Sequence, residues 1–406
     1  MKKLLFVINT LGQAGAETAL LNLLRQIDPK QYEVSLYVLM GQGEMVSELP
    51  EYVKLLNSSF NESPVLSGAG RRLMAQRVMA AAFRRGTVFR LLPYLLRNFF
   101  SMAAKRQVQM DKLLWRLLSD GGQRFSEKYD LAVAYLEGGS AYYVSDHVKA
   151  LKKTAFLHVD YGQAGYNRRL DKDCYLDFDR VYAVSDEVKA SFDKVYPECA
   201  ERCFVFHNLL DEEGIRWKAS LPGGFEDDFQ GIRILTVGRL TAQKAYDMAL
   251  EAMSLLKKQG EQVRWYVLGE GNQRKFLEEK RKKLSLEEDF LLMGAVKNPY
   301  PYFAQADIYV HATRFEGKSI AIQEAQILGK PVLVSDCSGN REQVTGDVDG
   351  LFCDLTPESI CGGIQMMIHD PELRARLGRA AARRSFGDRA ELDKLLELSV
   401  ERNSRL

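Results

Sequence analysis

The chain carries at residues 307–335 the stretch DIYVHATRFEGKSIAIQEAQILGKPVLVS, in which two apolar runs flank a helical pattern. The first run predicts a buried strand over 307–311, and the second predicts another over 332–335. Between them we expect a turn at Gly317 and a helix over 319–328, which the following glycine and proline end. A strand, a helix and a strand in this order are the unit from which parallel sheets are built.

The same alternation extends through both halves of the chain. Apolar runs are separated by helical stretches or polar turns, as a doubly wound parallel sheet requires. Downstream of residue 230 we expect strands at 232–237, 263–268, 290–293, 307–311 and 332–335, with helices at 246–258, 272–284, 319–328, 371–384 and 389–403. Upstream we expect strands at 3–9, 33–39, 131–135, 154–158, 180–184 and 203–206, and a helix at 17–26.

The length of 406 residues predicts two domains, because a single hydrophobic core rarely grows beyond about 250 to 300 residues. We therefore predict an α/β fold of two Rossmann-like domains whose parallel sheets face a central cleft. The first domain is expected over residues 1–212, a linker over 213–230 and the second domain over 231–385. Residues 386–406 are expected to form a helix that packs back on the first domain.

Composition argues against several classes of protein. The 56 basic and 54 acidic residues nearly cancel, which excludes a general nucleic-acid binder. The apolar run Leu4–Ile8 is too short for a secretory signal, and no apolar run reaches the length of a membrane span. Six cysteines in so long a chain predict no disulfide framework. We therefore expect a cytoplasmic protein.

Residues 70–116 are strongly basic, with eleven Lys or Arg and a single acidic residue. We expect them to lie in a helical insertion, at about 70–120, in the first domain. Their apolar residues alternate with arginines, as in helices that lie on an anionic membrane. We therefore hypothesise that residues 71–116 bind the inner face of the cell membrane peripherally; the alternative is a solvated basic cover over a core stripe. The residues expected to enter the headgroup layer are Leu91, Leu95, Phe99 and Phe100.

The start of the helix predicted at 319–328 is suited to binding a phosphate. In open α/β sheets ligands bind beyond the carboxyl ends of the strands, where a helix N-terminus offers free amides and a positive dipole end. Arg239 and Lys244 follow the strand predicted at 232–237 and reach the same sheet edge. A guanidinium and an ammonium there neutralise the charge that grows on a diphosphate leaving group.

Two carboxylates, Glu316 and Glu324, flank this helix start. They are eight positions apart, which spans roughly 12 Å along a helix, so that one is placed to reach a sugar and the other a ribose. The working pair of a glycoside hydrolase lies about 5 to 10 Å apart, and the spacing argues against that class. Asp347 and Asp349 have the spacing of a metal-binding pair, but their surroundings favour a turn before a strand at 351–353.

Four motifs follow one another in the second half: Val237-Gly238-Arg239-Leu240 with Lys244, Leu268-Gly269-Glu270-Gly271, Gly294-Ala295-Val296, and Glu316-Gly317-Lys318-Ser319 with Glu324. In this order they resemble the retaining glycosyltransferases of family 4, which have the GT-B fold. The resemblance is best over residues 231–370. It is weaker in the first half, where segments 12–17, 156–160 and 182–185 are similar to landmarks of the family.

The resemblance implies a role for each matching residue. Arg239 and Lys244 would hold the donor diphosphate, and Glu316 would contact the transferred sugar. Glu324 would accept ribose hydroxyls, while the amides at the helix start cap the β-phosphate and the backbone near residue 296 meets the base. A histidine of the first domain would face the donor sugar. The implied catalytic residues are His158, Glu316, Arg239 and Lys244, and the implied donor-binding residues are Gly15, Val296, Gly317, Lys318, Ser319, Ile320 and Glu324.

What the resemblance implies is transfer of a sugar from a nucleotide-diphosphate sugar, UDP in preference to GDP, to a saccharide or lipid-linked acceptor in surface polysaccharide synthesis. The nucleotide sugar is a co-substrate, and neither a cofactor nor a metal is implied. Ala245 replaces the glycine usual after the lysine, and Lys318 stands where many members have an aromatic residue. Two other functions stay open: a nucleotide-sugar 2-epimerase of the same fold, and a non-catalytic partner that binds sugar nucleotides.

Overall fold

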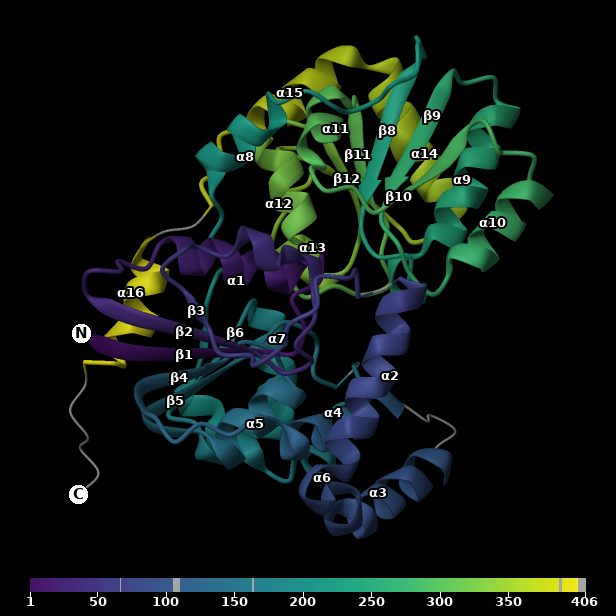
Figure 1. Ribbon diagram of the computed structural model, residues 1–406. Coiled ribbons are helices and arrows are strands. Elements are labelled where there is room, and N and C mark those ends of the chain that lie inside the picture. Colours follow the sequence, from purple (N-terminus) through teal and green to yellow (C-terminus); the bar gives the residue numbers. More distant parts are fainter. Residues whose placement is uncertain (66, 105–109, 163, 387–388, 401–406) are drawn as a thin grey trace. The chain divides into compact units, whose positions relative to one another are not determined.

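The chain folds into two compact units (Figure 1). Met1–Leu209 and the segment from Gly387 onward form the first unit, and Leu210–Phe386 form the second. The computed structural model of the protein describes residues 1–65, 67–104, 110–162, 164–386 and 389–400.

The first unit is built on a parallel sheet of seven strands in the order β3-β2-β1-β4-β5-β6-β7. The order reverses between β1 and β4, which is the switch point of a Rossmann-like sheet. Leu4–Ile8 are fully buried, as expected for a strand covered on both faces. The strands are β1 (Lys2–Ile8), β2 (Tyr32–Val38), β3 (Lys54–Leu55), β4 (Lys128–Ala134), β5 (Lys149–Leu157), β6 (Arg180–Ala183) and β7 (Cys203–Val205).

A helical insertion separates β3 from β4, where the sequence predicts one. It consists of α2 (Gly68–Phe83), the 3-10 turn η2 (Arg84–Gly86), α3 (Thr87–Ala104) and α4 (Met110–Gly121). The other helices of this unit are α1 (Gly15–Arg25), α5 (Gly139–His147), α6 (Arg168–Asp171), α7 (Asp186–Val195) and α16 (Arg389–Glu397), with the 3-10 turns η1 (Glu44–Glu48), η3 (Cys174–Asp177) and η4 (Pro197–Arg202).

The C-terminal α16 packs within the first unit. The hydroxyl of Tyr182 on β6 donates a hydrogen bond to the backbone carbonyl of Lys394 at 2.9 Å. Of the segment 386–406, residues 387–388 and 401–406 lie outside the described residues.

The second unit contains a parallel sheet of six strands in the order β10-β9-β8-β11-β12-β13. This is again a Rossmann-like order, and its switch point lies between β8 and β11. The fold class predicted from the sequence is therefore confirmed in both units. The strands are β8 (Ile232–Val237), β9 (Val263–Leu268), β10 (Phe290–Gly294), β11 (Ile308–His311), β12 (Val332–Ser335) and β13 (Leu351–Cys353).

Helices cover both faces of the second sheet (Figure 1). α9 (Tyr246–Lys258), α10 (Arg274–Lys283) and α14 (Pro357–His369) pack along one face, and α8 (Glu212–Ala219), α11 (Tyr300–Gln305) and α12 (Ile320–Ile327) pack along the other. The remaining elements are η5 (Ala242–Lys244), α13 (Ser338–Arg341) and α15 (Pro371–Ala381).

Helix α8 corrects the prediction of an irregular linker over 213–230. The Asp211 side chain accepts a hydrogen bond from the amide of Gly214 and caps the helix, and two glutamates occupy its first turn. Both features stabilise a helix N-terminus.

The basic insertion differs from its prediction in three residues. Leu91 is only 4% exposed, in a small cluster between α2, α3 and α4, and Leu95 packs against the same cluster. Arg116 is fully buried, because it pairs with Asp146 and donates to the backbone carbonyl of Asp171 at 2.7 Å. These residues of the predicted membrane surface therefore stabilise the fold.

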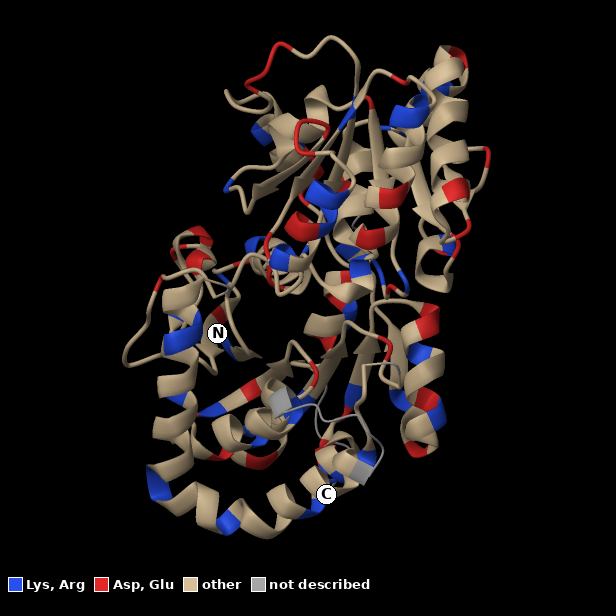
Figure 2. Cartoon of the chain, turned by 90° about the vertical axis from the view of Figure 1, so that its right-hand side faces the viewer, with Lys and Arg blue, Asp and Glu red and all other residues tan. Residues whose placement is uncertain are grey.

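The outward face of α3 is apolar as well. Four large side chains spaced at three or four residues are exposed there: Phe89 (72%), Leu92 (46%), Leu96 (47%) and Phe100 (64%). Residues 67–104 contain seven arginines and no acidic residue, and Figure 2 shows α2 and α3 with blue segments and no red ones. Residues 105–109, which continue the basic segment in sequence, lie outside the described residues. No helix in the described part of the chain has the length and apolarity to cross a membrane.

Candidate active site

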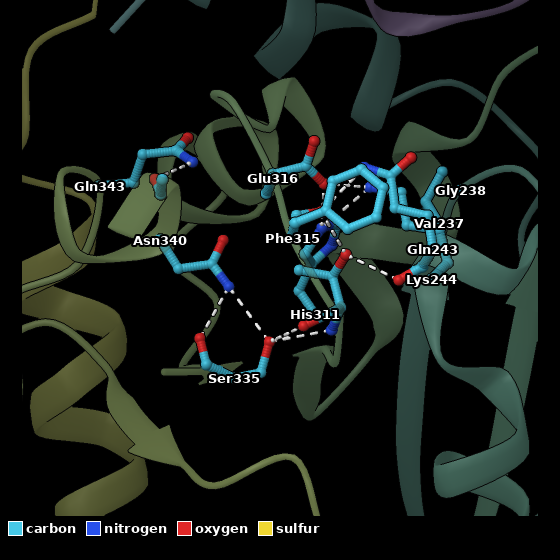
Figure 3. Close-up of polar contacts among 12 residues, drawn as sticks. Val237, Gly238, Gln243, Lys244, His311, Phe315, Glu316, Ser335, Asn340 and Gln343 are labelled. Carbon is cyan, nitrogen blue, oxygen red and sulfur yellow. Dashed lines mark hydrogen bonds and ion pairs between the residues drawn. The ribbon is translucent and has the colours of Figure 1, made fainter. Parts of the chain in front are cut away.

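The loops that follow β8 and β11 meet at the switch point of the second sheet. The two strands are neighbours, with Tyr309 opposite Leu235, so both loops leave the same edge. The amide of Arg314 donates to the backbone carbonyl of Gln243 at 2.8 Å, and the Gln243 side chain donates to the carbonyl of Phe315 at 2.8 Å (Figure 3). These bonds hold the two loops together.

Three charged or titratable side chains converge here (Figure 3). The ammonium group of Lys244, on the loop after β8, forms an ion pair with Glu316 Oε2. His311, the last residue of β11, places Nε2 3.0 Å from the same carboxylate oxygen and 3.1 Å from Lys244 Nζ. Two of the four predicted catalytic residues, Lys244 and Glu316, are therefore in contact.

The cluster is electrostatically polarised. Burial opposes ionisation of Glu316, but Lys244 and His311 outweigh it and hold the pKa of this carboxyl well below its usual range. Burial, reinforced by the charge of Lys244, lowers the pKa of His311 to about 4. At neutral pH the cluster therefore contains a carboxylate and a neutral imidazole.

Glycines allow the backbones of the motifs to approach closely. A Cβ on Gly269 would lie 2.0 Å from the carbonyl oxygen of Gly238, and a Cβ on Gly339 would lie 2.2 Å from that of Glu316. Ala245 has a left-handed φ of 46°, a conformation that glycine adopts without strain. This conformation gives a physical reason for the glycine usual at that position in the family.

Helix α12 starts beside the cluster. Ser319 is its N-cap residue, with an extended backbone, and its hydroxyl makes no capping hydrogen bond to any described residue. The first amides of a helix have no intrahelical acceptor, so this end can receive an anion. Gly317 and Ile320 are buried, and the Lys318 side chain is half-buried.

Glu324 lies one turn further along α12 and is 7% exposed. Burial raises the pKa of Glu324 to about 7, against the effect of a 2.9 Å hydrogen bond from the hydroxyl of Tyr300. Arg239 is exposed, and we find no hydrogen bond or ion pair from its guanidinium to any described residue. Val296 is half-buried two residues after β10. Their roles in donor binding stay predictions.

His158 and Gly15 belong to the first unit. The Nε2 atom of His158 is buried without a hydrogen-bond partner among the described residues, and its backbone amide donates to Glu137 at 3.0 Å. Burial lowers the pKa of His158 to about 4, opposed by a hydrogen bond with the Tyr135 backbone. Gly15 begins α1, and a Cβ there would meet no described atom within 4 Å. The roles of both residues stay predictions.

Asp347 and Asp349, which have the spacing of a metal-binding pair, lie in a turn. Asp349 accepts a hydrogen bond from the amide of Thr345 at 2.7 Å and pairs with Arg384 at 2.7 Å. The segment forms the turn predicted before β13. The contacts of Asp349 therefore support the interpretation as a turn over that as a metal site.

Sequence reasoning missed His311. Its position at the end of an apolar run was interpreted only as the end of a strand, and the spacing of five residues to Glu316 gives no standard motif. Only the fold identifies His311 as a site residue, because the carboxyl ends of β8 and β11 bring it beside Lys244.

Residues 228–384 match the family model of glycosyl transferases group 1. This segment of the chain belongs to that family. The match covers every strand of the second sheet and includes the Lys244–Glu316–His311 cluster. The Campylobacter jejuni relative described next extends the similarity to nearly the whole chain.

The curated proteins similar to this chain include bacterial glycosyltransferases. The N-acetylgalactosamine-N,N'-diacetylbacillosaminyl-diphospho-undecaprenol 4-alpha-N-acetylgalactosaminyltransferase of Campylobacter jejuni is 26% identical over 397 residues, which are 97% of each chain. The amylovoran biosynthesis glycosyltransferase AmsD of Erwinia amylovora is 29% identical over 150 residues, 37% of this chain and 42% of that protein.

Solved structures confirm the GT-B fold. Anabaena HepE in complex with UDP aligns with a TM-score of 0.65 at 16% identity, covering 98% of this chain and 99% of HepE. The lipopolysaccharide outer core galactosyltransferase WaaB aligns with a TM-score of 0.55 at 16% identity, covering 98% and 99%. At such identities the alignment shows the fold of this glycosyltransferase and not its substrates.

Proposed function

We propose that this glycosyltransferase moves a sugar, with retention, from a UDP-sugar to a lipid-linked or polysaccharide acceptor in surface glycan synthesis. The observation that carries the proposal is the Lys244–Glu316–His311 cluster at the switch point of the second sheet, beside the start of α12. An ammonium and free helix amides bind a diphosphate, while an ionised carboxylate accepts sugar hydroxyls. The lipid-linked acceptor is suggested by the Campylobacter jejuni relative, whose name specifies one.

The other predicted residues complete the proposed donor site. Arg239 is free to bind the diphosphate, and Glu324 and the backbone near Val296 would meet the ribose and the base. The roles of His158 and Gly15, which belong to the first unit, stay predictions from the family resemblance. HepE, which shares the fold, was solved with UDP and with UDP-glucose, and UDP is therefore the first nucleotide to test.

The donor proposal predicts selective stabilisation by UDP. A ligand that binds only the folded state raises its stability, by about 2.7 kcal/mol at a concentration one hundred times Kd. We expect 1 mM UDP to raise Tm by several degrees, and 1 mM GDP to raise it less. Differential scanning fluorimetry measures both, with uridine as the control that lacks the diphosphate. A larger shift with GDP would overturn the choice of base.

Turnover separates the proposal from its alternatives. A transferase consumes donor rapidly only with an acceptor, an epimerase converts the donor alone, and a binding partner consumes none. Quantifying donor, product sugar nucleotide and free UDP with and without a lipid-linked saccharide distinguishes the three.

Metal independence is part of the proposal. Cations and helix amides are proposed to stabilise the leaving diphosphate, a task that other transferases give to a divalent metal. We expect kcat to change less than about twofold in 5 mM EDTA. If EDTA abolishes activity and Mg²⁺ or Mn²⁺ restores it, the enzyme requires a metal, and Asp347 and Asp349 become candidate ligands again.

We also propose that α2 and α3 dock on an anionic membrane. The outward face of α3, defined by Phe89, Leu92, Leu96 and Phe100, is apolar and exposed. Arg90 and Arg97 flank it, and Arg84 and Arg85 stand exposed at the junction with α2. An apolar stripe bordered by arginines fits the interface of a bilayer with anionic headgroups. Such docking would bring the enzyme to a lipid-linked acceptor.

A further inference from the structure

His311 makes contacts that neither strand packing nor donor binding requires. It is 1% exposed, yet both ring nitrogens meet polar atoms: Nε2 lies 3.0 Å from Glu316 Oε2, and Nδ1 lies 3.2 Å from the hydroxyl of Tyr309. Tyr309 is itself fully buried. The resulting chain of groups, Tyr309 to His311 to Glu316, runs from the core of the second unit to the proposed sugar site.

We infer that His311 is a positioning residue that keeps the Glu316 carboxylate in place once Lys244 has turned from it to the donor diphosphate. The inference rests on the function proposed above. In the unliganded protein two side chains meet Glu316 Oε2, the ammonium of Lys244 and the imidazole of His311. A diphosphate carries more negative charge than one carboxylate, so it draws the ammonium away, and the imidazole is the donor that stays.

The neighbours of His311 fix its tautomer once the donor is bound. In the unliganded protein Nε2 lies near both Glu316 Oε2, which only accepts, and Lys244 Nζ, which only donates. After Lys244 has turned to the diphosphate the carboxylate remains, so Nε2 must carry the proton. Nδ1 then accepts from the hydroxyl of Tyr309, whose other polar neighbour, the carbonyl oxygen of Val237, lies further away at 3.4 Å. Tyr309 therefore stabilises the tautomer that donates to Glu316.

Glu316 needs this donor because it is partly enclosed. Its side chain is 13% exposed, and a buried carboxylate without a cation or a donor takes up a proton. A protonated Glu316 would accept the sugar hydroxyl less well. The titratable groups that face Glu316 are Lys244, Tyr246, Tyr309 and His311.

Kinetics of three variants test the inference. We expect His311→Leu to lower kcat by about a hundredfold with donor KM changed less than about threefold, because the loss follows diphosphate binding. In the pH profile of kcat for His311→Leu, the acid limb should move up by about one pH unit or more, because Glu316 is easier to protonate without the imidazole. His311→Gln, which offers an amide donor near Nε2, should recover kcat to within about tenfold. Tyr309→Phe, which keeps the ring, should show a smaller fall with the same shift of the acid limb.

Glu316→Gln distinguishes failure of the inference from failure of the proposed function. If Glu316→Gln is active, the proposed site is wrong. If Glu316→Gln is inactive while His311→Leu and Tyr309→Phe keep the wild-type kcat and acid limb, only the inference is overturned. If His311→Leu does not fold, the other two variants decide. The inference is overturned if Tyr309→Phe leaves the acid limb unchanged. It is also overturned if the kcat of His311→Gln is no higher than that of Glu316→Gln.

A measurement without turnover tests the tautomer directly. The chain has five histidines, so long-range ¹H–¹⁵N spectra of the imidazole rings are simple, and His311→Gln assigns the missing signal. We expect His311 to be protonated at Nε2 in the UDP complex. Protonation at Nδ1 in the UDP complex would overturn the inference.

Discussion

Lys244→Ala is expected to lower kcat/KM for the donor by about a thousandfold, and Arg239→Ala by about a hundredfold. Negative charge grows on the β-phosphate as the glycosidic bond breaks, and both cations are proposed to neutralise it. Lys244 is given the larger effect because the fold holds it at the switch point beside Glu316, whereas Arg239 is exposed. Initial rates at varied donor concentration measure both variants.

Stability should change far less than catalysis. The Lys244 ammonium pairs with a carboxylate that also receives a bond from His311, so its loss is expected to lower the free energy of unfolding by about 1 to 2 kcal/mol. Arg239→Ala should stay within about 0.5 kcal/mol of wild type, as for other exposed side chains. Urea unfolding measures these values.

Lys282→Ala and Arg379→Ala are matched controls, because both side chains are exposed cations of the same unit that the site does not use. They should keep wild-type kinetics. Near wild-type turnover in Lys244→Ala or Arg239→Ala would remove that residue from the proposed site.

The regular part of the fold could be predicted because it depends on local patterns. Buried parallel strands appear as apolar runs, and the run at 332–335 coincides with β12 residue for residue. Strand β3 has only two residues, Lys54 and Leu55, and no apolar run marks it. Helix α8 was missed because the glycines and proline that follow it dominate the pattern.

The site could be predicted only as far as its motifs extend. Glu316 and Lys244 stand in motifs, and the structure joins them in one cluster. His311 stands in none, because its role depends on the pairing of β11 with β8 across more than 70 residues of sequence. The outward face of α3 was predicted only in part for a similar reason. Phe99 and Phe100 are exposed as predicted, but packing against α4 shows that Leu91 points inward.

Changing Arg84, Arg85, Arg90 and Arg97 together to Gln is expected to abolish binding to anionic vesicles. Each cation near an anionic surface contributes about 1 kcal/mol, so the loss of four weakens binding about a thousandfold. Wild-type protein should sediment with vesicles that contain phosphatidylglycerol, sediment weakly with pure phosphatidylcholine, and be released by 0.5 M NaCl, since salt screens surface charges. A second variant with Phe89, Leu92, Leu96 and Phe100 changed to Ser should bind weakly even at low salt, because the apolar face is removed.

Lys275, Lys282, Lys283 and Arg379 changed together to Gln form the matched control, with the same loss of charge from exposed positions of the second unit. This variant should bind vesicles like the wild type, because docking is assigned to α2 and α3 and not to net charge. The four-arginine variant should keep the thermal shift with UDP, since the proposed diphosphate and base contacts belong to the second unit. If wild-type protein does not sediment with anionic vesicles at low salt, or if both quadruple variants lose binding equally, α3 is not the docking surface. In the first case the exposed apolar face must have another occupant, and a soluble acceptor becomes the better hypothesis.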